Sequence, residues 1–325
     1  MSARRSTLDQ SWYALWAIDD LPRWHSRRHR CRRRGSPRAR AAIGLATRCG
    51  ARVKIVDVLP RVPDGVRHFV TPDLEKELVD HRRERLKAIA DGVQGVPVTT
   101  ELLRGRPGIA LIQEVLRSGH DLLARSHGRD LAEAPRPFGA IDMELLRQCP
   151  CPVWLIGRRG SPPGRWRILA AVHANPSDAA EQELNGTILD WALMLKAFGD
   201  AELTLLQAWT AYGASLLRSR MSPDEFTEFI EAARRTEDEA LSGFVAPFKD
   251  RLTDVAVELV QGEPEDVIAR FVESHGVDVV VMGTVARTGI AGLVMGNTAE
   301  RVLQRLRGSV LAVKPPGFES PVART

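Results

Sequence analysis

Short apolar runs alternate with segments of helical spacing through the second half of the chain. The apolar runs predict strands at 168–172, 203–207, 255–260, 279–282 and 310–313. Helical spacing predicts helices at 184–198, 223–248, 265–274 and 299–306. Three of the five strands are almost continuously apolar, as strands are when helices cover both faces of their sheet. The pattern therefore predicts an α/β domain with a parallel sheet.

The same pattern occurs earlier in the chain at a constant offset of 157 residues. Gly105-Arg-Pro corresponds to Gly262-Glu-Pro, with Pro264 as its last residue, and the apolar run 153–156 corresponds to 310–313. Several motifs at one fixed offset indicate a duplicated domain. The sequence therefore predicts two tandem copies of one fold.

The duplication sets the expected domain boundaries. We expect one doubly wound α/β domain at 1–157 and a second at 166–317, with the regular pattern of the first copy starting at Ala41. Residues 158–165 are rich in Gly, Pro and Arg, which is typical of a linker. Residues 318–325 form a tail.

Positive charge is concentrated in one short segment. The 325 residues carry a net charge of +5, but residues 21–40 hold nine arginines and no acid. Without these nine arginines the chain sums to −4, so the body of the protein is mildly acidic. This distribution argues against a nucleic-acid partner, because such proteins spread their basic residues over a face of the fold.

The basic segment, 20–40, stands where a short loop and the start of a helix belong. Tyr13–Asp19 fits a first strand before it. A run of like charges this dense repels itself and stays solvated. Three explanations remain open: an insertion that contacts nucleic acid, a plain disordered insertion, or a reading-frame error that replaced the native start. Normal helical sequence from Ala41 onward favours the last.

Cysteine usage and hydropathy predict a cytoplasmic protein. Four cysteines in a chain of this length do not make a disulfide framework, and no apolar run is long enough for a membrane span or a secretory signal. Cys149 and Cys151 precede the last strand of the first copy. Two cysteines at this spacing on an extended segment point to opposite faces, so we expect buried structural thiols and no metal site.

The sequence contains none of the usual catalytic motifs. It has no Gly-x-Ser-x-Gly elbow, no His-Glu-x-x-His helix and no Walker phosphate loop. We therefore expect a protein that is not an enzyme.

The loop after the fourth strand of the second copy is the best candidate for ligand binding. It runs from 282 to 300 and contains Gly283, Gly289, Gly292 and Gly296. Asn297 and Glu300 have the spacing of a capping box at the start of the next helix. Glycines beside a helix N-terminus let backbone N–H groups reach an anion such as phosphate. The alternative is a glycine-rich connector followed by an ordinary helix cap.

The C-terminal third of the chain resembles the end of a universal stress protein domain. The resemblance rests on Val279–Ile290, Met295–Val302 and Val310–Pro315. Nucleotide-binding members of that family carry Gly-x2-Gly-x9-Gly followed by Ser or Thr. This chain keeps the spacing as Gly283-x2-Ala286-x9-Gly296, with alanine at the second glycine and Asn297 at the first hydroxyl. The Gly-x-Pro motif also fits the family's third-strand loop.

The resemblance implies a five-stranded parallel sheet of order 3-2-1-4-5 in each domain. It further implies that the second domain binds ATP or another adenine nucleotide, with slow ATP hydrolysis at most. The implied site residues are His173, Ala174, Gly262, Pro264, Met282, Gly283, Thr284, Arg287, Gly296, Asn297 and Thr298. His173 stands where nucleotide-binding members have an Asp that holds the adenine side.

The first copy departs further from the family pattern. Shifted by 157 residues, Gly283 becomes Ser126, Ala286 becomes Arg129, and only Gly296 keeps a glycine, Gly139. We expect Arg129 to pair with Asp130, Glu133 or solvent, and the first domain to bind no nucleotide.

The resemblance also implies how the two copies assemble. Family dimers pair through their last strands, so we expect an internal pair with pseudo-two-fold symmetry through 153–156 and 310–313. A homodimer of the whole chain is a further expectation, and a membrane partner is not expected. Two other functions stay open, a ligand-free interaction scaffold and a carrier of another small molecule.

Overall fold

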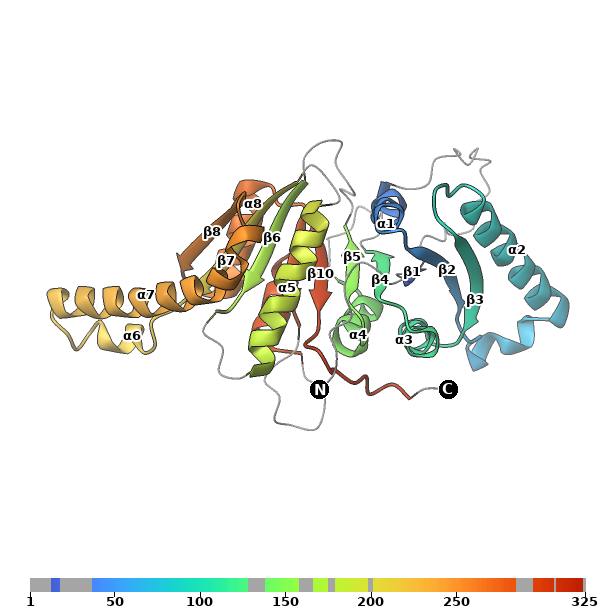
Figure 1. Cartoon of the computed structure of the whole chain (residues 1–325). Coiled ribbons are helices and arrows are strands. Elements are labelled where there is room, and N and C mark those ends of the chain that lie inside the picture. The colour runs from blue at the N-terminus through green and yellow to red at the C-terminus, as the bar shows by residue number, and fades with distance from the viewer. Residues whose placement is uncertain are drawn as a thin grey trace. The chain divides into compact units, whose positions relative to one another are not determined.

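The computed structural model describes residues 13–17, 37–127, 138–157, 166–174, 179–197, 201–284, 295–306 and 308–323. Its elements form two compact units, unit 1 with β1 to β5 and unit 2 with β6 to β10 (Figure 1). Arg287, the predicted linker, the pair Arg129 and Asp130, and most of the basic segment lie outside the described residues.

Unit 1 alternates strands with helices. Its elements are β1 (Tyr13–Ala17), α1 (Pro37–Cys49), β2 (Arg52–Leu59), the 3-10 helix η1 (Asp64–Phe69), α2 (Pro72–Ala90), β3 (Val98–Arg104), α3 (Pro107–Ser118), β4 (Leu122–Ser126), α4 (Ala140–Gln148) and β5 (Val153–Ile156). β1 lies between β2 and β4 and is parallel to both. Of the strand predicted at Tyr13–Asp19, the part Tyr13–Ala17 is therefore present, and residues 18 and 19 lie outside the described residues.

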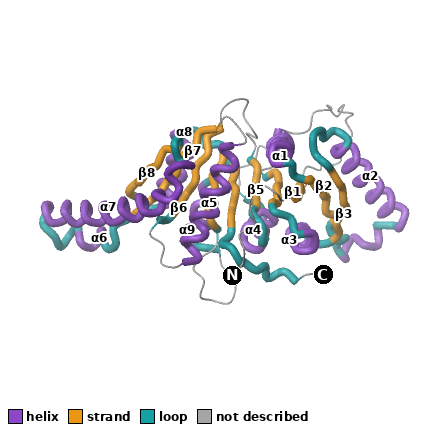
Figure 2. Tube along the Cα trace, viewed as in Figure 1, coloured by secondary structure: helices purple, strands orange, loops and turns teal. Residues whose placement is uncertain are grey.

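Unit 2 repeats this order with one additional short helix. Its elements are β6 (Trp166–Val172), α5 (Ala179–Ala197), β7 (Ala201–Trp209), α6 (Ala214–Leu217), α7 (Pro223–Val245), the 3-10 helix η2 (Ala246–Arg251), β8 (Val255–Gln261), α8 (Pro264–His275), β9 (Val279–Gly283), α9 (Asn297–Arg305) and β10 (Ser309–Val313). The long helix α7 runs outward from the sheet with α6 beside it (Figures 1 and 2).

Strand pairing within each unit is parallel throughout. The pairings of unit 1 run β3-β2-β1-β4-β5. Those of unit 2 run β8-β7-β6-β9-β10. The predicted α/β class with parallel strands is confirmed. Because strand order reverses beside β1 in unit 1 and beside β6 in unit 2, a ligand site is expected at the carboxyl ends of these central strands.

Strands β9 and β10 carry much of the core of unit 2. All five residues of β10 are buried, as are Val279 to Met282 of β9. Helix α5 packs across β6, β7, β9 and β10, and α8 packs against α9. This burial explains why β9 and β10 could be found from apolar runs alone. None of the helices in the described part of the chain is long and apolar enough to cross a membrane.

Candidate functional site

Three strands of unit 2 end together at what we call the carboxyl edge of its sheet. β6, β9 and β10 are neighbours, and the residues directly after them are His173, Thr284 and Lys314. The first turn of α9 starts from the same place, because its N-cap Gly296 is bonded to Thr284. The structure thus brings together predicted site residues from two distant parts of the chain.

Thr284 and Gly296 close the glycine-rich loop. The Gly296 N–H donates to the Thr284 carbonyl at 3.2 Å, and the Thr284 N–H donates to the Val313 carbonyl at 3.3 Å. Both amides therefore bond within the protein. An anion at this edge must use N–H groups further into α9.

Helix α9 is capped one residue earlier than predicted. Gly296 is the N-cap, with φ −60° and ψ 137°, and Asn297 is the first helical residue. The predicted Asn297–Glu300 capping box is wrong, because the extended residue that caps the helix has no side chain. The first intrahelical bond runs from the Glu300 N–H to the Gly296 carbonyl at 2.9 Å. The amides of Asn297, Thr298 and Ala299 precede it, so they lie in the first turn of the helix and have no intrahelical partner.

A buried lysine adds positive charge at the carboxyl edge. Lys314 is 6% exposed, and its Nζ donates to the hydroxyl of Thr284, which is 1% exposed. The same Nζ lies 5.2 Å from the centroid of the Phe318 ring. Little water screens this charge, so it attracts an anion more strongly than an exposed lysine does. Sequence reasoning missed Lys314, because a lysine directly after an apolar strand usually reaches into solvent.

Two buried amide side chains hold the backbone that follows β6. Asn185 of α5 accepts from the His173 N–H at 3.1 Å and donates to the His173 carbonyl at 2.6 Å. Gln207 of β7 accepts from the Ala174 N–H at 2.9 Å. The His173 side chain itself is exposed. We call Asn185 and Gln207 the amide clamp, since they fix the backbone and leave the imidazole free to point outward.

The amide clamp extends to helix α7. Gln207 is fully buried, and its Nε2 donates to Glu237 Oε2 of α7 at 2.7 Å. One side chain thus joins the loop after β6 to the long outer helix. A polar residue inside an apolar strand was the only sequence signal for Gln207, and the sequence offers no sign of its two partners.

The Gly-x-Pro motif shapes the turn into α8. Gly262 has φ +144°, which only glycine adopts readily, and its N–H donates to the Trp209 carbonyl at 2.8 Å. Pro264 is the first residue of α8. In unit 1, Gly105 has φ +124° and donates to the Leu59 carbonyl at 3.0 Å. The motif therefore has the same structural role in both units.

Packing accounts for Gly283. A Cβ at this position would lie 2.6 Å from Leu184 Cδ2 of α5, so any larger residue would have to displace the Leu184 side chain. The preceding Met282 is 5% exposed and belongs to the core. These two predicted site residues hold α5 against β9, and neither presents a side chain to the carboxyl edge.

At the equivalent edge of unit 1 two opposite charges are buried together. Arg125 of β4 and Asp142 of α4 form an ion pair in which each residue is 4% exposed. Asp142 also accepts from the Gly139 N–H at 2.8 Å, so its carboxylate lies at the N-terminus of α4. Burial lowers the pKa of Arg125 to about 10. The residues 157 positions later are Met282 and Ala299, and unit 2 has no such pair there.

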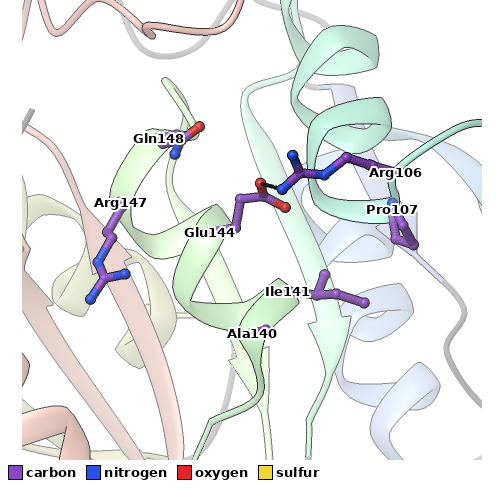
Figure 3. A pocket seen from close by; sticks show the side chains of 7 residues that line it. All are labelled: Arg106, Pro107, Ala140, Ile141, Glu144, Arg147 and Gln148. Atoms are coloured by element: carbon purple, nitrogen blue, oxygen red, sulfur yellow. Dashed lines mark hydrogen bonds and ion pairs between the residues drawn. The ribbon is translucent and has the colours of Figure 1, made fainter.

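A cavity of about 390 Å³ lies between α3 and α4 of unit 1 (Figure 3). Arg106 and Glu144 point toward each other across it and form an ion pair of 3.0 Å. The Glu144 carboxylate also lies so close to Gly108, in the first turn of α3, that a Cβ there would collide with it. An internal anion therefore already occupies this helix N-terminus, and the cavity adds no second anion site.

The universal stress protein family model matches residues 37–157 and 167–314. The chain belongs to the universal stress protein family. Universal stress protein E of Salmonella typhi is 28% identical over 299 residues, which cover 88% of this chain and 92% of that protein. The predicted resemblance to the tandem-domain type of universal stress protein is thereby confirmed.

Solved structures agree with this fold. A protein of Pseudomonas aeruginosa PAO1 superposes with a TM-score of 0.65 at 23% identity and covers 95% of this chain and 94% of its own. Another universal stress protein, solved in complex with cAMP, is 17% identical, covers 46% of this chain and 97% of its own, and has a TM-score of 0.33.

Proposed function

We propose that unit 2 is a nucleotide-binding universal stress protein domain that takes ATP or another adenine nucleotide at its carboxyl edge. The observation that carries the proposal is the bond between Gly296 and Thr284, which aims the first turn of α9 at the edge where Lys314 is buried. Helix N-terminal amides and a nearby cation both favour phosphate. The charge and the donors therefore complement a nucleotide's phosphates.

The proposal gives each group a binding role. The backbone amides of Asn297 and Thr298 hold phosphate oxygens, and Lys314 balances their charge. The exposed imidazole of His173 lies at the end of β6, on the side where the base is expected, and can donate or accept one hydrogen bond there. None of these groups is assigned a chemical step, so the proposed function is reversible binding, with slow ATP hydrolysis at most.

A ligand-free interaction scaffold is the second candidate, and one observation favours it. The Thr284 and Gly296 amides, two of the predicted phosphate donors, are already bonded within the protein. In that case the amide clamp and the cap of α9 would serve stability alone. The internal pair through β5 and β10 remains a prediction under either function.

Mass spectrometry of small molecules released on denaturation tests the proposal. Protein purified without added nucleotide, or incubated with ATP and then desalted, should release an adenine nucleotide. Gly296→Val should abolish this release, because a branched side chain at the cap covers the first turn of α9. The φ and ψ of Gly296 are open to valine, so the fold should survive.

Gly139→Val is the matched control for this experiment. Gly139 caps α4 of unit 1 as Gly296 caps α9, and its φ of −81° is also open to valine. The control variant should release as much nucleotide as the unaltered protein. Equal release from Gly296→Val, at unchanged secondary structure, rules out the site. No release from any variant supports the scaffold instead.

A further inference from the structure

Two thiols of unit 1 lie in contact where α4 meets β5. The sulfur atoms of Cys149 and Cys151 are 3.6 Å apart, and the residues are 0% and 7% exposed. The expectation that they point to opposite faces is wrong. Cys149 is the C-cap of α4, and β5 begins only at Val153, so the residues between them are not part of a strand.

The backbone between the two cysteines is tied to the fold only at its ends. The Cys149 N–H donates to the Leu145 carbonyl at 2.9 Å, and the Pro152 carbonyl accepts from the Leu123 N–H at 3.0 Å. Pro150 and Pro152 have no N–H to donate. The two prolines therefore leave Cys151 as the only residue from 150 to 152 with a backbone N–H.

Packing alone does not require thiols at this junction. The corresponding residues of unit 2, 157 positions later, are Leu306 and Gly308. Leu306 is 1% exposed and fills the same place after α9 that Cys149 fills after α4. An aliphatic side chain and a glycine thus satisfy the same packing in the second copy, and the paired sulfurs are specific to unit 1.

We propose that Cys149 and Cys151 are a modification site that closes to a reversible intramolecular disulfide when it meets a small disulfide such as oxidised glutathione. Cys151 is the more exposed residue and reacts first. Its thiolate attacks one sulfur of the reagent, forms a mixed disulfide and expels one thiolate, which takes up the proton that Cys151 has lost. The Cys149 thiolate then attacks the Cys151 sulfur and expels the second glutathione, which takes the proton of Cys149. The protein loses two hydrogens, and one disulfide reagent becomes two thiols.

Burial sets the expected rate of this reaction. It raises the pKa of Cys151 well above its ordinary value, and the hydrogen bond with Cys149 raises it further. The thiolate is the attacking species, so closure should be slow in the folded protein. A ring of this size is strained, which makes its disulfide easily reduced and so suited to reversible modification.

Intact-mass spectrometry tests the proposal on the full-length chain. Cys31 and Cys49 are first changed to Ser, so that only the pair can react. After incubation of the native protein with oxidised glutathione and acid quenching, the pair-only protein should lose the mass of two hydrogens and carry no glutathione. Dithiothreitol should restore the starting mass.

Single variants that also carry the Ser replacements of Cys31 and Cys49 show which of the two thiols reacts first. Cys149→Ser should retain one glutathione on Cys151, because the second thiol that releases it is gone. Cys151→Ser should stay almost unmodified over the same time, because Cys149 is fully buried. Circular dichroism of each variant verifies that the native fold was present during the reaction. A lasting glutathione adduct on the pair-only protein, or no mass change in it, overturns the proposal.

Discussion

At the scale of single residues, buried polar side chains decide how the carboxyl edge of unit 2 is built. The amide clamp fixes both backbone groups of His173 and the N–H of Ala174. A buried polar group left without its partner costs more than the bond itself contributes, so these side chains are tightly constrained. Their effect on binding is indirect, because they position the backbone and do not reach the proposed ligand.

Gln207→Met tests this positioning role. Methionine fills a similar volume but leaves the Ala174 N–H and the Glu237 carboxylate without their partner, at a cost of about 1–3 kcal/mol in the free energy of unfolding. ATP affinity should also fall, measured by calorimetry beside urea unfolding. Gln182→Met, on the exposed face of α5, is the control and should change neither quantity. Unchanged affinity in Gln207→Met would show that the clamp does not position the site.

The Arg125–Asp142 pair offers a second test at this scale. Asp142→Ala leaves a buried guanidinium without its carboxylate and should lower the free energy of unfolding by about 3–5 kcal/mol. Adding Arg125→Met recreates the pair Met282 and Ala299 of unit 2, and should recover much of that loss. Urea unfolding of both single variants and the double variant measures the coupling. If the double variant lost as much free energy of unfolding as the two single variants together, the stabilising interaction between Arg125 and Asp142 would be contradicted.

At the scale of elements, the pattern of hydrophobic residues was sufficient to predict where the long helices and the strands of unit 2 lie. The predicted strands of unit 2 match β6 to β10 to within two residues at each end, because each of these strands is rich in apolar residues. The short helix Ala214–Leu217 was missed, since four residues show no helical period. The cap of α9 was misplaced because glycine and asparagine are both acceptable caps. Lys314 and the amide clamp depend on partners distant in sequence, which one sequence does not reveal.

A buried ionic cluster joins three elements of unit 1. Glu114 of α3 is 1% exposed and lies 2.6 Å from the Nζ of Lys54, on β2, which also pairs with Glu101 of β3 at 2.6 Å. Arg117, Ser118 and His120 also hydrogen-bond to Glu114. Burial alone would raise the pKa of Glu114, but the hydrogen bonds, chiefly from Lys54, His120 and Ser118, outweigh it and hold the pKa at about 2.

Glu114→Gln should make the free energy of unfolding less dependent on pH in the acidic range. The pKa of Glu114 falls from an ordinary 4.5 to about 2 on folding, so its contribution is complete above pH 4.5 and is lost between pH 4.5 and 2. The variant should be less stable at neutral pH by about 3 kcal/mol. Its urea midpoint should then fall less steeply than that of the unaltered protein as the pH is lowered through this window. If the urea midpoints of the two proteins fell equally with pH, the pKa of Glu114 assigned to this cluster would be contradicted.

At the scale of the whole molecule, the two copies of the duplicated domain differ in the residues at the carboxyl edge of the sheet. Unit 2 has the first turn of α9, capped by Gly296 with no side-chain hydrogen bond, at the same carboxyl edge as a buried lysine. Unit 1 has a carboxylate, Asp142, at the corresponding helix N-terminus and a buried arginine beside it. The same fold therefore carries the proposed binding site in one copy and an internal ion pair in the other. This asymmetry predicts at most one nucleotide for each chain.

Calorimetric titration of the full-length protein with ATP measures that number directly. The account predicts one site for each chain, lost in Gly296→Val and retained in Gly139→Val. Two equivalent sites for each chain, or one site that survives Gly296→Val and disappears in Gly139→Val, would contradict it.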